Sequence, residues 1–264
     1  MLPIGDVNPA RRRGWVTGVL VAINVAVFLL LQPRGGCEEA AFLFRWAAIP
    51  AELTGLDQLS EGQAAEVIGS CAAAIGEKSV LASLVTAMFL HGSLVHLGGN
   101  MVYLLVFGNN VEDRLGHLRF LGFYLGGGAV ATAAFAVLNL GSSTPLLGAS
   151  GAVAAVLGAY VLLYPRARVH AIAGFPLYLV SILPGIAMRS WFLVAAIITV
   201  PAWLILGGWF VLQVLASAEP AVDSGVAYSA HVAGFLAGVV LLLLLDDRRR
   251  RRGVPQFHPP RRGG

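Results

Sequence analysis

The chain has 264 residues, of which 57% are hydrophobic and only 12% are charged. An ordinary soluble protein carries about 25% charged residues, so this composition excludes a typical water-soluble globular domain and predicts an integral membrane protein. Neither a P-loop nor a G-x-G-x-x-G motif after a strand occurs in the sequence, so no soluble cofactor is predicted.

Six apolar segments approach the length of about 20 residues that a transmembrane helix needs. They are Trp15–Leu31, Val80–Phe107, Phe120–Leu140, Leu147–Tyr164, Trp191–Leu215 and Tyr228–Leu245. We therefore predict an all-α, polytopic membrane bundle of six transmembrane helices at residues 15–247, between a cytoplasmic N-terminus (1–14) and a basic, disordered cytoplasmic tail (248–264). A further apolar segment, Ala171–Met188, contains two prolines. The sequence leaves three alternatives for it: an interfacial segment, a re-entrant segment or a seventh span.

Clusters of arginine predict the orientation of these spans. Arg11–Arg13 precede the first span and Arg248–Arg252 follow the last one, and the positive-inside rule places such clusters in the cytoplasm. With both termini inside, the number of spans is even, which favours six over seven. Arg114 and Arg119 are then expected in an inner loop between spans two and three. The net charge of +4 thus reflects topology and the anionic inner leaflet, and no nucleic-acid partner is predicted.

The first span follows basic residues and therefore also resembles a signal peptide. No small-x-small cleavage site closes it, so we expect a retained helix.

A long outer loop, residues 32–79, contains both cysteines, Cys37 and Cys71. Since the topology exposes this loop to an oxidising compartment, where disulfides persist, we predict a disulfide; two unrelated thiols are the alternative. Within the loop, Phe42–Pro50 mixes aromatic residues with one arginine, which is typical of an amphipathic segment lying in the membrane interface.

Span two begins with a cluster of polar residues that includes His91, His96 and Asn100. His96 and Asn100 are four residues apart and share a helical face, and an amide such as that of Asn100 is a suitable oxyanion donor. Zinc binding is the alternative. It is disfavoured because the H-E-x-x-H motif is absent and the cluster lacks a carboxylate, so we predict no metal.

Ser150 stands at the start of span four between Gly148 and Gly151. A serine at a helix N-terminus has free backbone N–H groups beside it that could stabilise an oxyanion. An N-cap role is the commoner function of a serine in this position, so Ser150 taken alone leaves both interpretations open.

His231 lies near the start of span six, and Gly234 and Gly238 follow it on the same helical face. These glycines, with Gly151 and the small residues of span four, predict close helix packing. Such packing would let the His231 imidazole reach the Ser150 hydroxyl, which is the arrangement of a base and its nucleophile. A histidine bonded to a backbone carbonyl is the alternative.

Together these motifs resemble the rhomboid intramembrane serine proteases, in particular bacterial members. The motifs are H-x-x-x-x-H-x-x-x-N in span two, G-x-S-G in span four and A-H-x-x-G-x-x-x-G in span six. Each is weak alone, but three in this order are specific. The resemblance implies a six-helix fold and a catalytic dyad of Ser150 and His231. It also implies an oxyanion hole from Asn100 and His96, supported by His91, without a carboxylate member, so Asp223 is expected to be structural.

The resemblance further implies hydrolysis of single-span membrane proteins in or near their transmembrane segments. Span five, with Leu206–Phe210, is expected to control substrate entry. The implied location is a bacterial inner membrane, with the active site open to the outer side. Two other classes of protein are alternatives. A non-catalytic rhomboid relative that binds membrane proteins is disfavoured because the chain retains both serine and histidine. A small transporter is disfavoured because the polar residues gather toward one side of the membrane.

Overall fold

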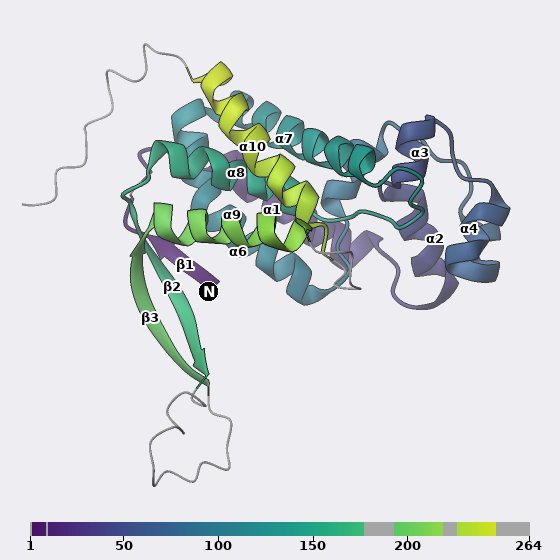
Figure 1. Cartoon of the computed structure of the whole chain (residues 1–264), viewed down its shortest axis with the longest axis horizontal. Helices are drawn as coiled ribbons and strands as arrows, with labels where there is room; N and C mark the ends of the chain where they lie inside the picture. The colour runs from purple at the N-terminus through teal and green to yellow at the C-terminus, as the bar shows by residue number, and fades with distance from the viewer. Residues whose placement is uncertain (1, 9, 177–192, 219–225, 247–264) are drawn as a thin grey trace, which may run out of the picture.

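The computed structural model describes residues 2–8, 10–176, 193–218 and 226–246, and most of them form helices that run side by side (Figure 1). The bundle consists of α1 (Trp15–Ala26) with its π-helical extension η1 (Val27–Leu31), α5 (Ser83–Thr86), η3 (Ala87–Phe89), α6 (Leu94–Leu115), α7 (His117–Leu138), α8 (Ser150–Leu163), α9 (Ala202–Ala218) and α10 (Tyr228–Leu245). Small helices lie at one end of the bundle and a sheet lies at the other.

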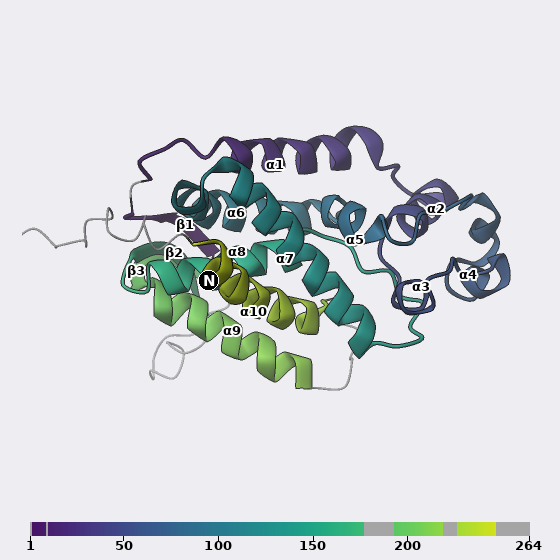
Figure 2. The same cartoon turned by 90° about the horizontal axis from the view of Figure 1, so that it is seen from above.

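Helix α8 forms the centre of the bundle and packs against α6, α7, α9 and α10 (Figure 2). Every residue from Ala152 to Tyr160 is buried. A helix that is apolar on all faces is normally found inside a large protein or a membrane, and here the protein itself covers it. The residue that begins this central helix is Ser150.

Each of the six predicted spans contains a helix, but the helices differ in length. Two of those described, α7 and α10, are long and apolar enough to cross a membrane, and the bent pair α5–η3 plus α6 would count as a third. The remaining three apolar helices, Trp15–Leu31, Ser150–Leu163 and Ala202–Ala218, are shorter than the roughly 20 residues that span a bilayer. The structure therefore supports a membrane helical bundle, and the number six stays a prediction.

A three-stranded antiparallel sheet corrects the all-α prediction. It consists of β1 (Leu2–Asp6), β2 (Arg168–Pro176) and β3 (Leu193–Pro201), in the order β1-β2-β3. The predicted fifth span began at Trp191, but its first part is β3, and α9 starts only after Pro201. The run Ile197–Val200 is entirely β-branched, which suits a strand. Residues 177–188 of the ambiguous apolar segment lie outside the described residues, as does the predicted C-terminal tail, 248–264.

The structure of span two differs from the predicted segment Val80–Phe107 in two ways. The segment does not form one straight helix, because the chain bends by 98° between Phe89 and Leu94. At the other end, α6 extends to Leu115, and only Gly116, with a φ of +83°, separates it from α7. Arg114 and Arg119 therefore lie within helices rather than in an inner loop. Glycine adopts this φ without strain, which permits so short a connection.

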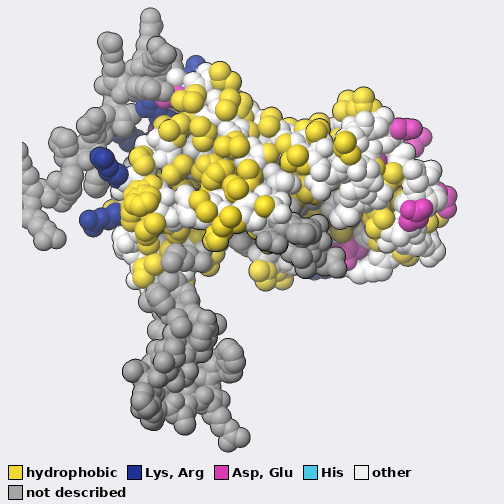
Figure 3. Space-filling view, in the orientation of Figure 1, with side chains coloured by type: hydrophobic (Ala, Val, Ile, Leu, Met, Phe, Trp, Pro, Cys, Tyr) yellow, Lys and Arg dark blue, Asp and Glu magenta, His cyan; other side chains and the backbone are white. Residues whose placement is uncertain are grey.

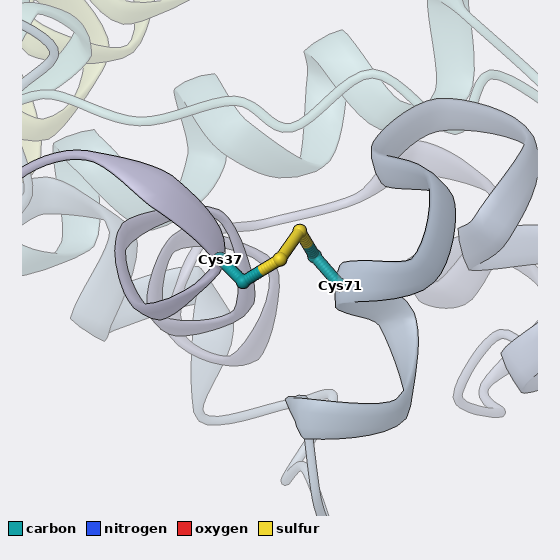
Figure 4. Close-up of a disulfide and its surroundings, with 2 residues drawn as sticks. All are labelled: Cys37 and Cys71. Carbon is teal, nitrogen blue, oxygen red and sulfur yellow. A yellow bond between two sulfur atoms is a disulfide. The ribbon is translucent and has the colours of Figure 1, made fainter.

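The outer loop folds into a compact unit, here called the outer domain. It contains α2 (Gly36–Trp46), α3 (Pro50–Gly55), α4 (Glu61–Ile68) and η2 (Gly69–Ala74), and it has its own small core around Phe44 and Ile49. Cys37 on α2 and Cys71 on η2 form a disulfide (Figure 4). Phe44 and Ile49 of the Phe42–Pro50 segment are buried in this core, whereas Trp46 is 39% exposed, so the interfacial location of this segment stays a prediction.

A buried ion pair completes the outer domain. The Lys78 ammonium contacts the Glu52 carboxylate and donates hydrogen bonds to the carbonyl oxygens of Phe44 and Ala47 at 2.8 and 2.7 Å. The domain is also joined to the segment that precedes α8, because Ala48 and Leu146 exchange two backbone hydrogen bonds. The outer domain is therefore hydrogen-bonded to the segment that leads into α8 and Ser150.

Charge is distributed unequally along the bundle. On the face seen in Figure 3, hydrophobic side chains cover the helices, Lys and Arg gather at the sheet end, and Asp and Glu gather at the outer domain. An apolar belt on this face thus lies between a basic end and an acidic end, and the orientation in the membrane stays a prediction.

Candidate active site

Ser150 is the first residue of α8, and its partly exposed side chain does not cap the helix. The N-cap is Ala149, whose side chain makes no capping hydrogen bond. The preceding Gly148 has a φ of +117°, a conformation that L side chains rarely adopt. This turn leaves the Ser150 hydroxyl at the entry of the helix, where the first backbone N–H groups have no intrahelical acceptor.

Glycines bring α10 into backbone contact with α8. A Cβ atom on Gly234 would overlap the carbonyl oxygen of Gly151, and one on Gly238 would overlap that of Ala155. Gly151 follows Ser150 directly, and His231 precedes Gly234 by one helical turn. The packing predicted from the small residues is therefore present, and it brings the first turn of α10 beside the start of α8.

The polar cluster of span two lies against the same turn. A Cβ atom on Gly148 would meet the His96 ring at 2.7 Å and the Asn100 Nδ2 atom at 3.8 Å. The Asn100 side chain is 8% exposed, and its buried Nδ2 donor has no hydrogen-bond partner among the described residues. Buried polar groups are normally paired, so a free donor aimed at the turn before Ser150 is suited to binding an oxyanion.

His91 occupies the bend before α6 and is completely buried. Its ring contacts that of His96 edge to face, with centroids 5.1 Å apart. Its backbone is held by Gln32, whose Nε2 donates to the His91 carbonyl at 2.8 Å. His91 thus packs behind His96, as a supporting residue would.

His231 contacts α9 through a residue that the sequence analysis missed. Its Nδ1 atom lies 2.7 Å from Oε1 of Gln213, and its ring lies beside Trp209, with centroids 5.8 Å apart. A glutamine inside an apolar helix is itself a functional signal, and that signal could have identified Gln213.

Two further predictions concern a metal site and Asp223. Within the described parts of the chain, no group of three or more His, Cys, Asp or Glu side chains is arranged to hold a metal ion. Asp223 lies outside the described residues. The candidate site contains a serine, three histidines and the Asn100 amide, a set suited to acyl transfer.

Comparison with known proteins identifies the fold family. The rhomboid domain matches residues 78–248. The chain belongs to the rhomboid family. This stretch includes Ser150, His231 and the polar cluster of α6, and membership makes the protein an integral membrane protein.

Several curated relatives are similar to parts of the chain. RHOMBOID-like protein 6, mitochondrial, of Arabidopsis thaliana is 26% identical over 196 residues, which cover 67% of this chain and 62% of that protein. Presenilin-associated rhomboid-like protein A, mitochondrial, of Danio rerio is 36% identical over 87 residues, or 32% of this chain and 23% of the relative. Rhomboid protein 1, mitochondrial, of Saccharomyces cerevisiae is 35% identical over 92 residues, or 33% and 26%.

The chain spans less than two thirds of the length of each of these three relatives. All three are named as mitochondrial, so they do not support the expectation of a bacterial protein.

Proposed function

We propose that this rhomboid protein is an intramembrane serine endopeptidase that hydrolyses peptide bonds in or near the transmembrane segments of membrane proteins. The observation that carries the proposal is the backbone contact between α8 and α10 at Gly151 and Gly234. Close approach at this point serves a reaction that needs the Ser150 hydroxyl near the His231 imidazole.

In the proposed mechanism, the Ser150 Oγ attacks the carbonyl carbon of the scissile bond while His231 takes the hydroxyl proton as general base. The negative oxygen that develops accepts hydrogen bonds from Asn100 Nδ2 and the Ser150 backbone N–H, with His96 as a further donor. His231 then gives its proton to the leaving amine, and water attacks the acyl-enzyme by the reverse route.

The substrate we propose is a single-span membrane protein. A helical peptide engages its carbonyls in i→i+4 hydrogen bonds, so the substrate helix has to unwind near the cleaved bond. By family analogy, small residues such as alanine or glycine suit the cleavage point, and span five, here α9, controls entry. Apart from this substrate and the lipid bilayer, the proposal requires no partner and no cofactor.

The proposal includes a topology of six spans with both termini in the cytoplasm and a site open to the outer side. The basic sheet end and the acidic outer domain support this orientation (Figure 3), and so does the disulfide on the outer domain, since disulfides persist in oxidising compartments. The proposal that this membrane is a bacterial inner membrane rests on features of the sequence alone.

The test is cleavage of a tagged single-span substrate by purified protein in liposomes. We expect Ser150→Ala and His231→Ala to abolish cleavage. Ser217→Ala and His170→Ala serve as matched controls, because the Ser217 hydroxyl donates to the Val214 carbonyl oxygen in its own helix and His170 lies in the sheet. Cleavage by Ser150→Ala at the wild-type rate would contradict the proposal and favour a role in binding membrane proteins without hydrolysis.

A further inference from the structure

The imidazole of His231 is held by two consecutive turns of α9. Gln213 supplies a polar contact, Oε1 to Nδ1 at 2.7 Å. Trp209, one turn earlier on the same helix, packs against the ring. Tyr228, on α10 itself, meets the ring edge on, with centroids 6.5 Å apart. Gln213 thus makes a directional contact to the ring, while the two aromatic residues restrict its position.

The Gln213 contact determines which ring nitrogen carries the proton. A neutral imidazole has one N–H donor and one acceptor nitrogen, and an amide oxygen can only accept. With Oε1 facing Nδ1, the proton resides on Nδ1 and the lone pair is on Nε2. Nε2 is then the nitrogen able to take a proton from a serine hydroxyl.

We propose that Gln213 is a positioning residue that holds His231 in the tautomer required for general-base catalysis. It would serve the orienting role that a buried carboxylate serves in a Ser-His-Asp triad, but as a neutral amide, which a membrane-embedded helix accommodates at lower cost than a charge. This inference rests on the proposed function and adds a third residue to its catalytic pair.

The location of Gln213 on α9 has a mechanical consequence. Nδ1 keeps its acceptor only while α9 packs against α10, so sideways displacement of α9 would release the imidazole to rotate or change tautomer. The reactivity of the base is thereby linked to the position of a neighbouring helix.

Three variants test the proposal in the full-length protein in liposomes. Gln213→Met has a similar length but no oxygen acceptor for an N–H. Gln213→Glu keeps an acceptor at the same place. Leu212→Met, at the adjacent and exposed position, controls for the substitution itself. All are compared with the wild type for kcat and KM on the same single-span substrate.

We expect Gln213→Met to lower kcat by about 10- to 100-fold with little change in KM, a smaller loss than the ~10⁴-fold seen when a triad carboxylate is replaced. Gln213→Glu restores most of the lost kcat, and Leu212→Met behaves as wild type. An unchanged kcat in Gln213→Met, or a Gln213→Glu variant no better than Gln213→Met, would overturn the proposal.

A spectroscopic measurement separates this inference from the proposed function. Solid-state NMR of ¹⁵N-histidine-labelled protein, with the His231 signals assigned by their loss in His231→Ala, reports the tautomer without substrate. We expect Nδ1 to carry the proton in the wild type and a mixture of tautomers in Gln213→Met. Protonated Nε2 in the wild type would overturn the role of Gln213, whereas cleavage retained by Ser150→Ala would overturn the serine-protease proposal alone.

Discussion

Replacing Gly234 by alanine tests whether close packing of α8 and α10 is required for activity. The added Cβ would overlap the Gly151 carbonyl oxygen and lie 3.3 Å from the Ala131 Cβ. An ordinary close C···O contact is about 3.3 Å, so α10 has to recede by roughly 1 Å at this level. Overpacking of this kind typically costs about 1–3 kcal/mol.

The expected effect on catalysis is larger than the effect on stability. A displacement of 1 Å between reacting groups costs about 10²-fold in rate, and Gly234 lies one turn from His231. We therefore expect Gly234→Ala to cleave a single-span substrate about 10²-fold more slowly while still folding. Cleavage in liposomes and thermal unfolding in detergent measure the two quantities.

Gly122→Ala is the matched control, since nothing lies within 4 Å of a Cβ at that position of α7. This variant should cleave at the wild-type rate. If Gly234→Ala also cleaves at that rate, the dyad does not depend on contact between the backbones of α8 and α10.

Four further predictions concern the candidate site and the outer domain. Asn100→Ala should lower kcat about 10²–10³-fold, as loss of an oxyanion donor does, whereas Asn139→Ala, whose amide bonds within its own helix, should not; equal rates would exclude the oxyanion role. Replacing Cys37 by serine removes a disulfide that joins residues 34 apart and should destabilise the outer domain by about 4 kcal/mol. Amide hydrogen exchange measures this loss, and unchanged protection of the amides of the outer domain would contradict it. Lys78→Ala leaves the Glu52 carboxylate buried without its cation and should cost about 3–5 kcal/mol, more than the double variant Lys78→Met/Glu52→Leu. Burial lowers the pKa of Lys78, so just below the ordinary lysine pKa the unfolded chain binds a proton that the folded chain has lost. Stability of the outer domain should therefore rise with pH through that range. Urea unfolding at several pH values measures this, and a fall in stability would contradict it.

The helices around the candidate site could be predicted from the sequence because their signals are local. The run Ala152–Leu163 is uniformly apolar, and α8 begins at Ser150 within the predicted segment. The glycines at 234 and 238 share one helical face, which predicted the contact with α8. Such patterns depend only on helical periodicity.

The sheet and the Gln213 contact could not be predicted in the same way. A short apolar run does not distinguish a buried strand from a helix, so Leu193–Pro201 was assigned to a span although its β-branched residues form β3. Gln213 belongs to no sequence motif, and its contact with His231 arises only from the position of α9 beside α10 in the folded structure.

The most direct test of the central claim is covalent labelling of the membrane-embedded protein with a fluorophosphonate, followed by mass spectrometry of the labelled site. We predict a single adduct on Ser150 that is lost in His231→Ala, because only an activated serine reacts. Labelling elsewhere, or equal labelling of Ser150 in the presence and absence of His231, would contradict the Ser150–His231 dyad.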